Sequence, residues 1–157
     1  MNSIRGLFKN PVHTVKNIYN LQEENKTLKK QIEQLMIAQS ANLQHSMKND
    51  FEIVNGIHFL GRKLEISDTN AVKTLGTNLI SEKPESIIAF AFEKEGKAQL
   101  MILVSKDITE KYQAGTMIRD AAKFIQGGGG GQAFFATAGG KNPAGIEEAI
   151  AAVKGMI

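Results

Sequence analysis

The amino-acid sequence predicts an α/β fold, in which a small mixed sheet with packed helices follows a long coiled-coil-like helix. Three observations support this prediction. Residues 12–48 contain neither Gly nor Pro, as a long uninterrupted helix requires. Residues 86–92 (SIIAFAF) and 98–104 (AQLMILV) are apolar runs, which are typical of strands covered on both faces. Residues 114–125 repeat apolar side chains at helical spacing, which indicates a helix packed on that sheet.

The expected helical segment covers residues 1–49, and the globular domain covers residues 50–157. Asn10 is the expected N-cap and Pro11 the first residue of a helix that ends near Lys48. Six residues share one heptad seam: Ile18, Asn25 and Ile32 at a, and Leu21, Leu28 and Leu35 at d. Asn at an a position favours a parallel dimer through this seam. The alternative is one arm of an antiparallel helical hairpin, truncated so that most of its first helix is missing.

The globular domain is expected to open with a hairpin and a capped helix. Asn55-Gly56 separates two short segments with apolar side chains. This pair is typical of a hairpin turn, because both of its central positions need a positive φ. Asp68 can cap the helix that follows and that ends before Pro84.

Three further elements complete the expected domain. Residues 93–97 (EKEGK) join the two apolar runs as a tight turn. A helix then carries its apolar stripe from Ala114 to Ile125. The last helix begins near Pro143 and buries Ile146, Ala149, Ile150 and Val153 on one face.

Composition limits the classes of function. The chain has 157 residues, with 19 Lys and Arg against 16 Asp and Glu, and no Cys. The lack of Cys excludes disulfides and thiolate zinc sites, and it indicates a reducing cytoplasm. We see neither an export signal nor an apolar run near the ~20 residues of a membrane span. His13, His45 and His58 lie far apart in the sequence, so we expect no metal site and no catalytic residue.

Residues 126–140 (QGGGGGQAFFATAGG) contain seven glycines and no charged side chain. They fail the P-loop pattern, and a dinucleotide-binding loop would follow a strand rather than a helix. A flexible linker would be polar, whereas AFFATA should be buried. We expect these glycines to adopt positive φ and to form a nest of N–H groups that suits a phosphate or the flat edge of a base pair. The alternative is that they only allow close packing of a loop.

Few charges accompany the glycines. Residues 51–157 hold twelve Lys and Arg and twelve Asp and Glu, so this domain is not broadly basic. Residues 121–146 contain Lys123 and Lys141 and no acidic side chain, which would let a polyanion approach. Lys106 lies in a strand-to-helix connection, where Asp107 is a possible cap.

The glycine motif and several flanking segments resemble the C-terminal domain of alanyl-tRNA synthetases. GGGGGQAFFATAGG is followed by GIEEAIAAVKG and preceded, in order, by EENKTLKKQIEQL, VNGIHFL and LMILVSKDITEKYQAG. The resemblance covers nearly the whole chain. A similar module, the DHHA1 domain, is appended to DHH-type phosphoesterases.

The resemblance implies a noncatalytic domain that binds the elbow of tRNA(Ala) and couples aminoacylation with editing. Its partners would be the tRNA and the catalytic and editing domains of the same parent chain, with a homodimer possible through the helix. It implies no cofactor in this segment, and ATP, Mg and zinc in other domains of the parent. The expected RNA-contacting residues are Gly127, Gly128, Gly129, Gly130, Gly131, Gln132, Gly139, Gly140, Lys141, Lys123 and Lys106. Many family members carry a basic side chain where this chain has Gly128, and Arg where it has Gln132, which weakens the expected attraction for phosphate.

Two alternatives stay open at this point. The first is the appended nucleic-acid-binding domain of a DHH-type phosphoesterase, although this chain has no DHH triplet. The second is an oligomerisation module that acts through the N-terminal helix.

Overall fold

The computed structural model describes residues 11–157, so the expected N-cap Asn10 lies outside the described residues. The chain forms two units, residues 1–41 and residues 42–157. Helix α2 (Pro11–Met47) begins at the expected Pro11 and extends from the first unit into the second.

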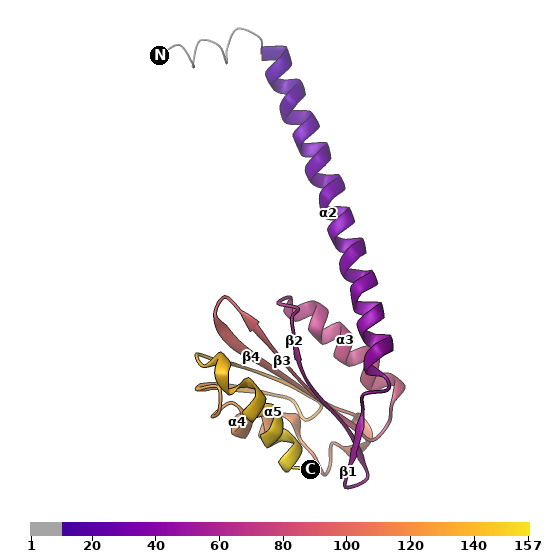
Figure 1. Ribbon diagram of the computed structural model, residues 1–157, viewed down its shortest axis with the longest axis vertical. Coiled ribbons are helices and arrows are strands. Elements are labelled where there is room, and N and C mark those ends of the chain that lie inside the picture. Colours follow the sequence, from indigo (N-terminus) through magenta and orange to yellow (C-terminus); the bar gives the residue numbers. More distant parts are fainter. Residues whose placement is uncertain (1–10) are drawn as a thin grey trace. The chain divides into compact units, whose positions relative to one another are not determined.

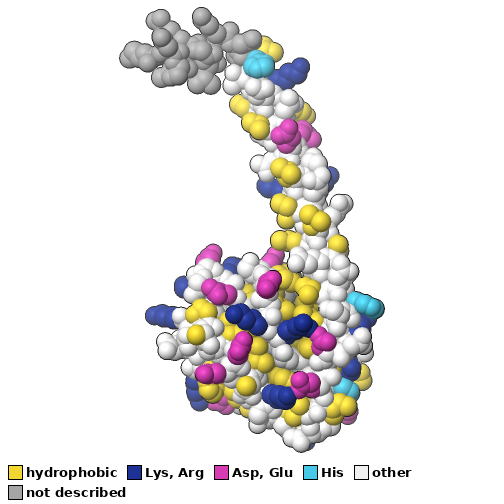
Figure 2. Space-filling view, in the orientation of Figure 1, with side chains coloured by type: hydrophobic (Ala, Val, Ile, Leu, Met, Phe, Trp, Pro, Cys, Tyr) yellow, Lys and Arg dark blue, Asp and Glu magenta, His cyan; other side chains and the backbone are white. Residues whose placement is uncertain are grey.

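In the first unit, α2 exposes the apolar side chains of the predicted seam. Ile18, Leu21, Leu28, Ile32 and Leu35 are between 51% and 69% exposed. The space-filling view shows hydrophobic side chains at intervals along this helix (Figure 2). Among residues 11–157, no helix combines the length and the apolar character that a membrane crossing requires.

The second unit is built on a six-stranded mixed sheet in the order β1-β2-β3-β4-β6-β5. The strands are β1 (Glu52–Val54), β2 (Ile57–Leu64), β3 (Ser86–Lys94), β4 (Lys97–Val104), β5 (Gly127–Gly131) and β6 (Phe135–Gly140). Strands β2 and β3 are parallel, and every other neighbouring pair is antiparallel. The predicted mixed α/β fold is therefore confirmed.

Two tight turns have the backbone that the sequence predicts. Asn55 and Gly56 take φ values of 52° and 86° between β1 and β2. Glu95 and Gly96 take 53° and 73° between β3 and β4. Positive φ at both central positions matches the twist of the flanking strands. The register buries the apolar residues of β3 and β4, whereas Ile53 of β1 is 73% exposed.

Helices cover both faces of the sheet (Figure 1). On one face, α4 (Ala114–Ala121) and α5 (Ile146–Gly155) bury Ile118 and Val153 against the sheet. On the other face, α3 (Thr69–Glu82) buries Leu75 against Phe90 of β3. Since β3 and β4 are covered on both sides, their continuous apolar sequences are explained.

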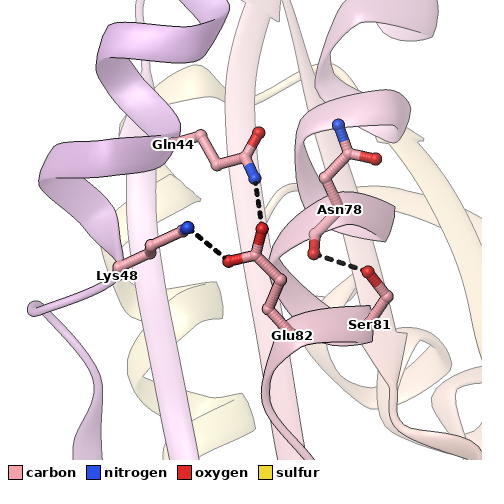
Figure 3. A network of polar contacts seen from close by, with 5 residues as sticks. All are labelled: Gln44, Lys48, Asn78, Ser81 and Glu82. Carbon is pink, nitrogen blue, oxygen red and sulfur yellow. Dashed lines mark hydrogen bonds and ion pairs between the residues drawn. The ribbon is translucent and has the colours of Figure 1, made fainter.

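The last turn of α2 belongs to the core of the second unit. Met47 is only 1% exposed and packs with the apolar residues under α3. Close to it, the Gln44 amide donates to Glu82 Oε1 at 3.0 Å, and Lys48 Nζ lies 2.6 Å from Glu82 Oε2 (Figure 3). The compact unit accordingly begins at Asn42, eight residues before the boundary that the sequence predicts.

One predicted helix boundary is confirmed and another is wrong. Asp68 caps α3 as expected, because its Oδ1 accepts from the N–H groups of Asn70 and Ala71 at 2.8 and 3.3 Å. Helix α4 ends at Ala121 rather than at Ile125, although Ile125 is still buried in the turn that follows.

Two connections, from β4 to α4 and from β6 to α5, contain short 3-10 helices. Ser105, not Asp107, is the N-cap of the one at Lys106–Ile108. The expected cap Asp107 instead accepts from the N–H of Glu85 at 2.8 Å. Pro143 begins the second 3-10 helix, Pro143–Gly145, from which α5 continues.

Candidate nucleic-acid interface

The five consecutive glycines form β5, the last strand of the sheet. They pair with β6 in antiparallel register, from Gly127 opposite Gly140 to Gly131 opposite Ala136. Among the described glycines, only Gly56 and Gly96 have positive φ. The expected nest of positive-φ N–H groups is therefore wrong, because these residues take extended backbone and use it to pair with a neighbouring strand.

Two alternating sets of glycines serve different purposes in β5. A Cβ at Gly127, Gly129 or Gly131 would lie within 3.0 Å of a carbonyl oxygen of β6. At Gly128 and Gly130, a Cβ would meet nothing within 4 Å. The first set is thus required for the close approach of β6, and the second faces open space.

The glycines at the end of β6 also differ in what they can contact. Gly140 is buried, and a Cβ there would collide with the carbonyl oxygen of Ile125. Gly139 is exposed, with the amide of Gln99 as its nearest neighbour at 3.3 Å. The structure therefore makes Gly140 a packing residue, whereas Gly139 is accessible.

The free edge of β5 presents backbone without side chains. Because β5 ends the sheet, its outward-facing peptide groups have no strand to pair with. The exposed residues of the strand are Gly127, Gly128, Gly129 and Gly131. Beyond it, the N–H of Gly115 donates to the carbonyl of Gln132 at 3.2 Å, which ties the chain to the start of α4. The N–H of Gly127 already donates to the carbonyl of Ala122 at 3.0 Å, so a flat or anionic partner would meet exposed backbone at the other exposed glycines of the strand.

The candidate lysines lie at opposite ends of the glycine strand. Lys123 and the exposed Lys141 flank the end where Gly127 meets Gly140. Lys106 is near the other end. It lies two residues after Val104, whose N–H donates to the carbonyl of Phe134 directly before β6. Five residues of strand separate these ends by roughly 13 Å, at ~3.3 Å per residue. The structure therefore does not gather the three lysines into one patch.

The charge of Lys123 is partly compensated. Its Nζ lies 2.8 Å from Oδ1 of Asp120, one residue outside the acid-free segment that the sequence indicates. Lys141 has no such ion pair among the described residues. The visible face of the globular unit intersperses Lys and Arg with Asp and Glu (Figure 2), so the positive charge available to a polyanion is local.

A groove that the sequence did not reveal adjoins β5. It has a volume of about 1120 Å³, and its lining includes Gly130, Gly131 and Gln132. Phe134 also lines it and is 43% exposed. We expected all of AFFATA to be buried, which is wrong at Phe134, although Ala136 and Ala138 are buried as expected.

Asp107 lies in the wall of this groove with its charge already engaged. A hydrogen bond from the Ser105 hydroxyl, together with the one from the N–H of Glu85, holds the pKa of Asp107 below its usual range. Those bonds stabilise the carboxylate form, so this wall keeps one fixed negative charge at neutral pH.

The described residues contain no group of three His, Cys, Asp or Glu side chains that could hold a metal ion. His13 and His45 lie on α2, and His58 lies on β2.

Comparison with known proteins identifies the family. The family model of the DHHA1 domain matches residues 56–157. Alanine–tRNA ligase of Christiangramia forsetii is 42% identical over 159 residues, covering 100% of this chain and 18% of the relative. That of Flavobacterium psychrophilum is 34% identical over 152 residues, covering 96% of this chain and 17% of the relative. The chain thus spans about a fifth of the length of these relatives.

A solved structure leads to the same family. The crystal structure of the C-Ala domain from Aquifex aeolicus alanyl-tRNA synthetase matches with a TM-score of 0.64 and 30% identity. The match covers 68% of this chain and 96% of that domain. Together, the family model, these relatives and this structural match show that the chain belongs to the DHHA1 family, as a C-Ala domain of the alanyl-tRNA synthetase type.

Proposed function

We propose that this chain is the noncatalytic C-terminal part of an alanine–tRNA ligase in the cytoplasm, and that it binds tRNA(Ala) at the elbow. The curated relatives with which it aligns over nearly its whole length are alanine–tRNA ligases. This favours such a parent over a DHH-type phosphoesterase. The ATP, Mg and zinc that a ligase of this kind uses would be bound by other domains of the parent.

The exposed glycine edge of β5 is the observation that supports RNA binding. Gly128 and Gly130 have open space where a side chain would lie. A phosphate chain or the flat outer face of a base pair can therefore approach the backbone more closely than at a strand with side chains. Folded RNA is recognised largely by shape and by backbone contacts, which suits a surface that offers main-chain groups.

The scarcity of charge makes this binding weak and dependent on salt. Lys141 and Lys106 are exposed, and Lys123 shares its charge with Asp120. If about three phosphates are neutralised, the slope of log K against log salt is roughly −2 to −3. Lys141→Ala should flatten that slope by about one.

A tRNA and a minihelix of its acceptor and TΨC arms, which lacks the elbow, test the proposal directly. We expect the chain to bind the tRNA at least roughly tenfold more tightly, a difference of about 1.4 kcal/mol. A tRNA with a changed anticodon should bind as well as the original. Equal affinity for tRNA and minihelix would contradict recognition of the elbow.

Coupling of aminoacylation with editing is the second part of the proposal. It requires that the chain hold the tRNA while the acceptor end moves between the catalytic and editing domains of the parent. Replacing the matching segment of the Christiangramia forsetii ligase with this chain provides the assay. The hybrid should aminoacylate tRNA and deacylate mischarged tRNA better than the ligase without the segment, and the isolated chain should do neither.

A homodimer through α2 is a second candidate function, and it rests on the exposed seam. Ile32 and Leu35 are 53% and 69% exposed, which leaves an apolar stripe available to a second helix. Sedimentation should show a dimer that Ile32→Glu with Leu35→Glu converts to a monomer. The thermal transition of residues 42–157 should survive in this variant, since neither residue belongs to that core. A wild-type monomer at high concentration would contradict the dimer.

A further inference from the structure

The groove beside β5 combines an accessible aromatic ring with cations. Phe134 is held in place by its backbone, because its carbonyl accepts from the N–H of Val104 at 2.9 Å. Its ring is nevertheless 43% exposed. Lys106 Nζ lies 5.7 Å from the centre of that ring. A phenyl ring with an ammonium group over it can contact both the base and the phosphate of one nucleotide.

A second lysine and several hydroxyl groups make the groove polar in places. Lys73 of α3 places its Nζ 4.8 Å from the ring centre of Phe135, which also lines the groove. Thr77 and Ser81, from the same helix, contribute further lining. Among the described residues that line the groove, Asp107 is the only acidic one, and its carboxylate already accepts hydrogen bonds. The groove therefore offers two ammonium groups against one carboxylate.

These features favour a nucleotide over an apolar protein segment. An apolar segment would cover two ammonium groups and supply no negative charge to either, which is costly. A nucleotide supplies an aromatic base for the ring and a phosphate for a lysine. The volume of about 1120 Å³ slightly exceeds the roughly 300–1,000 Å³ that is typical of small-molecule sites, so one nucleotide has enough room.

We propose that this groove holds one unpaired nucleotide of the bound RNA, with its base against Phe134 and its phosphate at Lys106. The inference rests on the proposed tRNA binding and adds a specific subsite to it. The groove is continuous with the glycine edge, since Gly130 and Gly131 belong to both. An RNA that lies along β5 thus reaches the groove without leaving the surface.

A tryptophan at residue 134 allows nucleotide binding in the groove to be measured by fluorescence, because the chain has no other Trp. In Phe134→Trp, a single-stranded tetra-adenylate should quench the fluorescence in a saturable way. AMP should need a concentration roughly tenfold higher or more, since it lacks the contacts to β5. Inorganic phosphate should not quench. Absence of quenching by tetra-adenylate would overturn the inference, and AMP as effective as the oligonucleotide would assign the groove to free nucleotides instead.

The tRNA affinity of variants in the groove tests this subsite separately from tRNA binding by the rest of the surface. Loss of stacking in Phe134→Leu should weaken binding by about fivefold or more. Phe124→Leu is the matched control, because Phe124 is 41% exposed but does not line the groove. Equal losses in the two variants, or no loss in either, would overturn the subsite while tRNA binding stands. If wild-type chain fails to bind tRNA while tetra-adenylate quenches Trp at residue 134, the proposed function fails and the groove remains a nucleotide site.

Discussion

At the scale of single residues, the glycines of β5 show that identical consecutive residues can have different structural roles. Gly127, Gly129 and Gly131 leave no room for a Cβ against β6, whereas Gly128 and Gly130 leave ample room. Packing can therefore explain three of the five. We expect the two that packing does not explain to be the ones that contact RNA.

Alanine substitutions should separate these two sets. Gly129→Ala should lower the free energy of unfolding by about 1–3 kcal/mol, because a Cβ collides with the partner strand. Gly128→Ala should leave it unchanged or raise it by roughly 0.5 kcal/mol through lower entropy of the unfolded chain. Urea unfolding of both variants measures the difference. Equal effects would contradict the alternation.

Asp107 should give stability a weak dependence on pH. Its pKa is lowered in the folded chain by the Ser105 and Glu85 hydrogen bonds. The unfolded chain therefore binds more protons, and the stabilisation is present above the ordinary carboxyl pKa of about 4. It disappears as the pH falls through the lowered pKa. The stability difference between wild type and Asp107→Asn should follow this course in urea unfolding, and a constant difference across that range would contradict it.

At the scale of elements, the sequence predicts most of the fold from local chemistry. The Asn55-Gly56 turn and the Asp68 cap each depend on neighbours within a few residues, so both predictions are confirmed. The glycine strand could not be predicted, because five residues without side chains show no alternation. Its existence depends on pairing with β6, which is a contact that only the folded chain makes.

The candidate site is less predictable than the elements. The glycine motif and its lysines could be found from the sequence, but their division between two ends of a strand could not. The groove is assembled from α3, the end of β4, the 3-10 helix Lys106–Ile108, the end of β5 and the start of β6. Such a site has no signature in a contiguous stretch of sequence, and the exposure of Phe134 is visible only once β4 fixes its backbone.

The end of α2 should be part of the cooperative core of the globular unit. Met47→Ala should lower the free energy of unfolding by about 2–5 kcal/mol, because it leaves a cavity under α3. Met36→Ala, on the same helix at 46% exposure, is the control and should change it by less than about 0.5 kcal/mol. A small effect at Met47 would show that α2 ends outside that core.

At the scale of the whole molecule, the two edges of the sheet have different environments. Strand β1 forms one edge, where Lys154 of α5 pairs with Glu52. Strand β5 forms the other edge, and its residues carry no side chains. Five strand spacings of ~4.8 Å put these edges roughly 24 Å apart. A partner that needs bare backbone can therefore engage the β5 edge alone.

The tRNA affinity of Gly128→Glu tests the central claim most directly. The new side chain has open space, so thermal melting should be unchanged while its carboxylate repels the RNA backbone at β5. Gly155→Glu is the matched control, because it adds the same charge in open space beside Lys154, toward the opposite edge. We predict that Gly128→Glu weakens tRNA binding at least roughly tenfold, about 1.4 kcal/mol, and that Gly155→Glu changes it much less. Full tRNA affinity in a folded Gly128→Glu protein would contradict binding at the glycine edge.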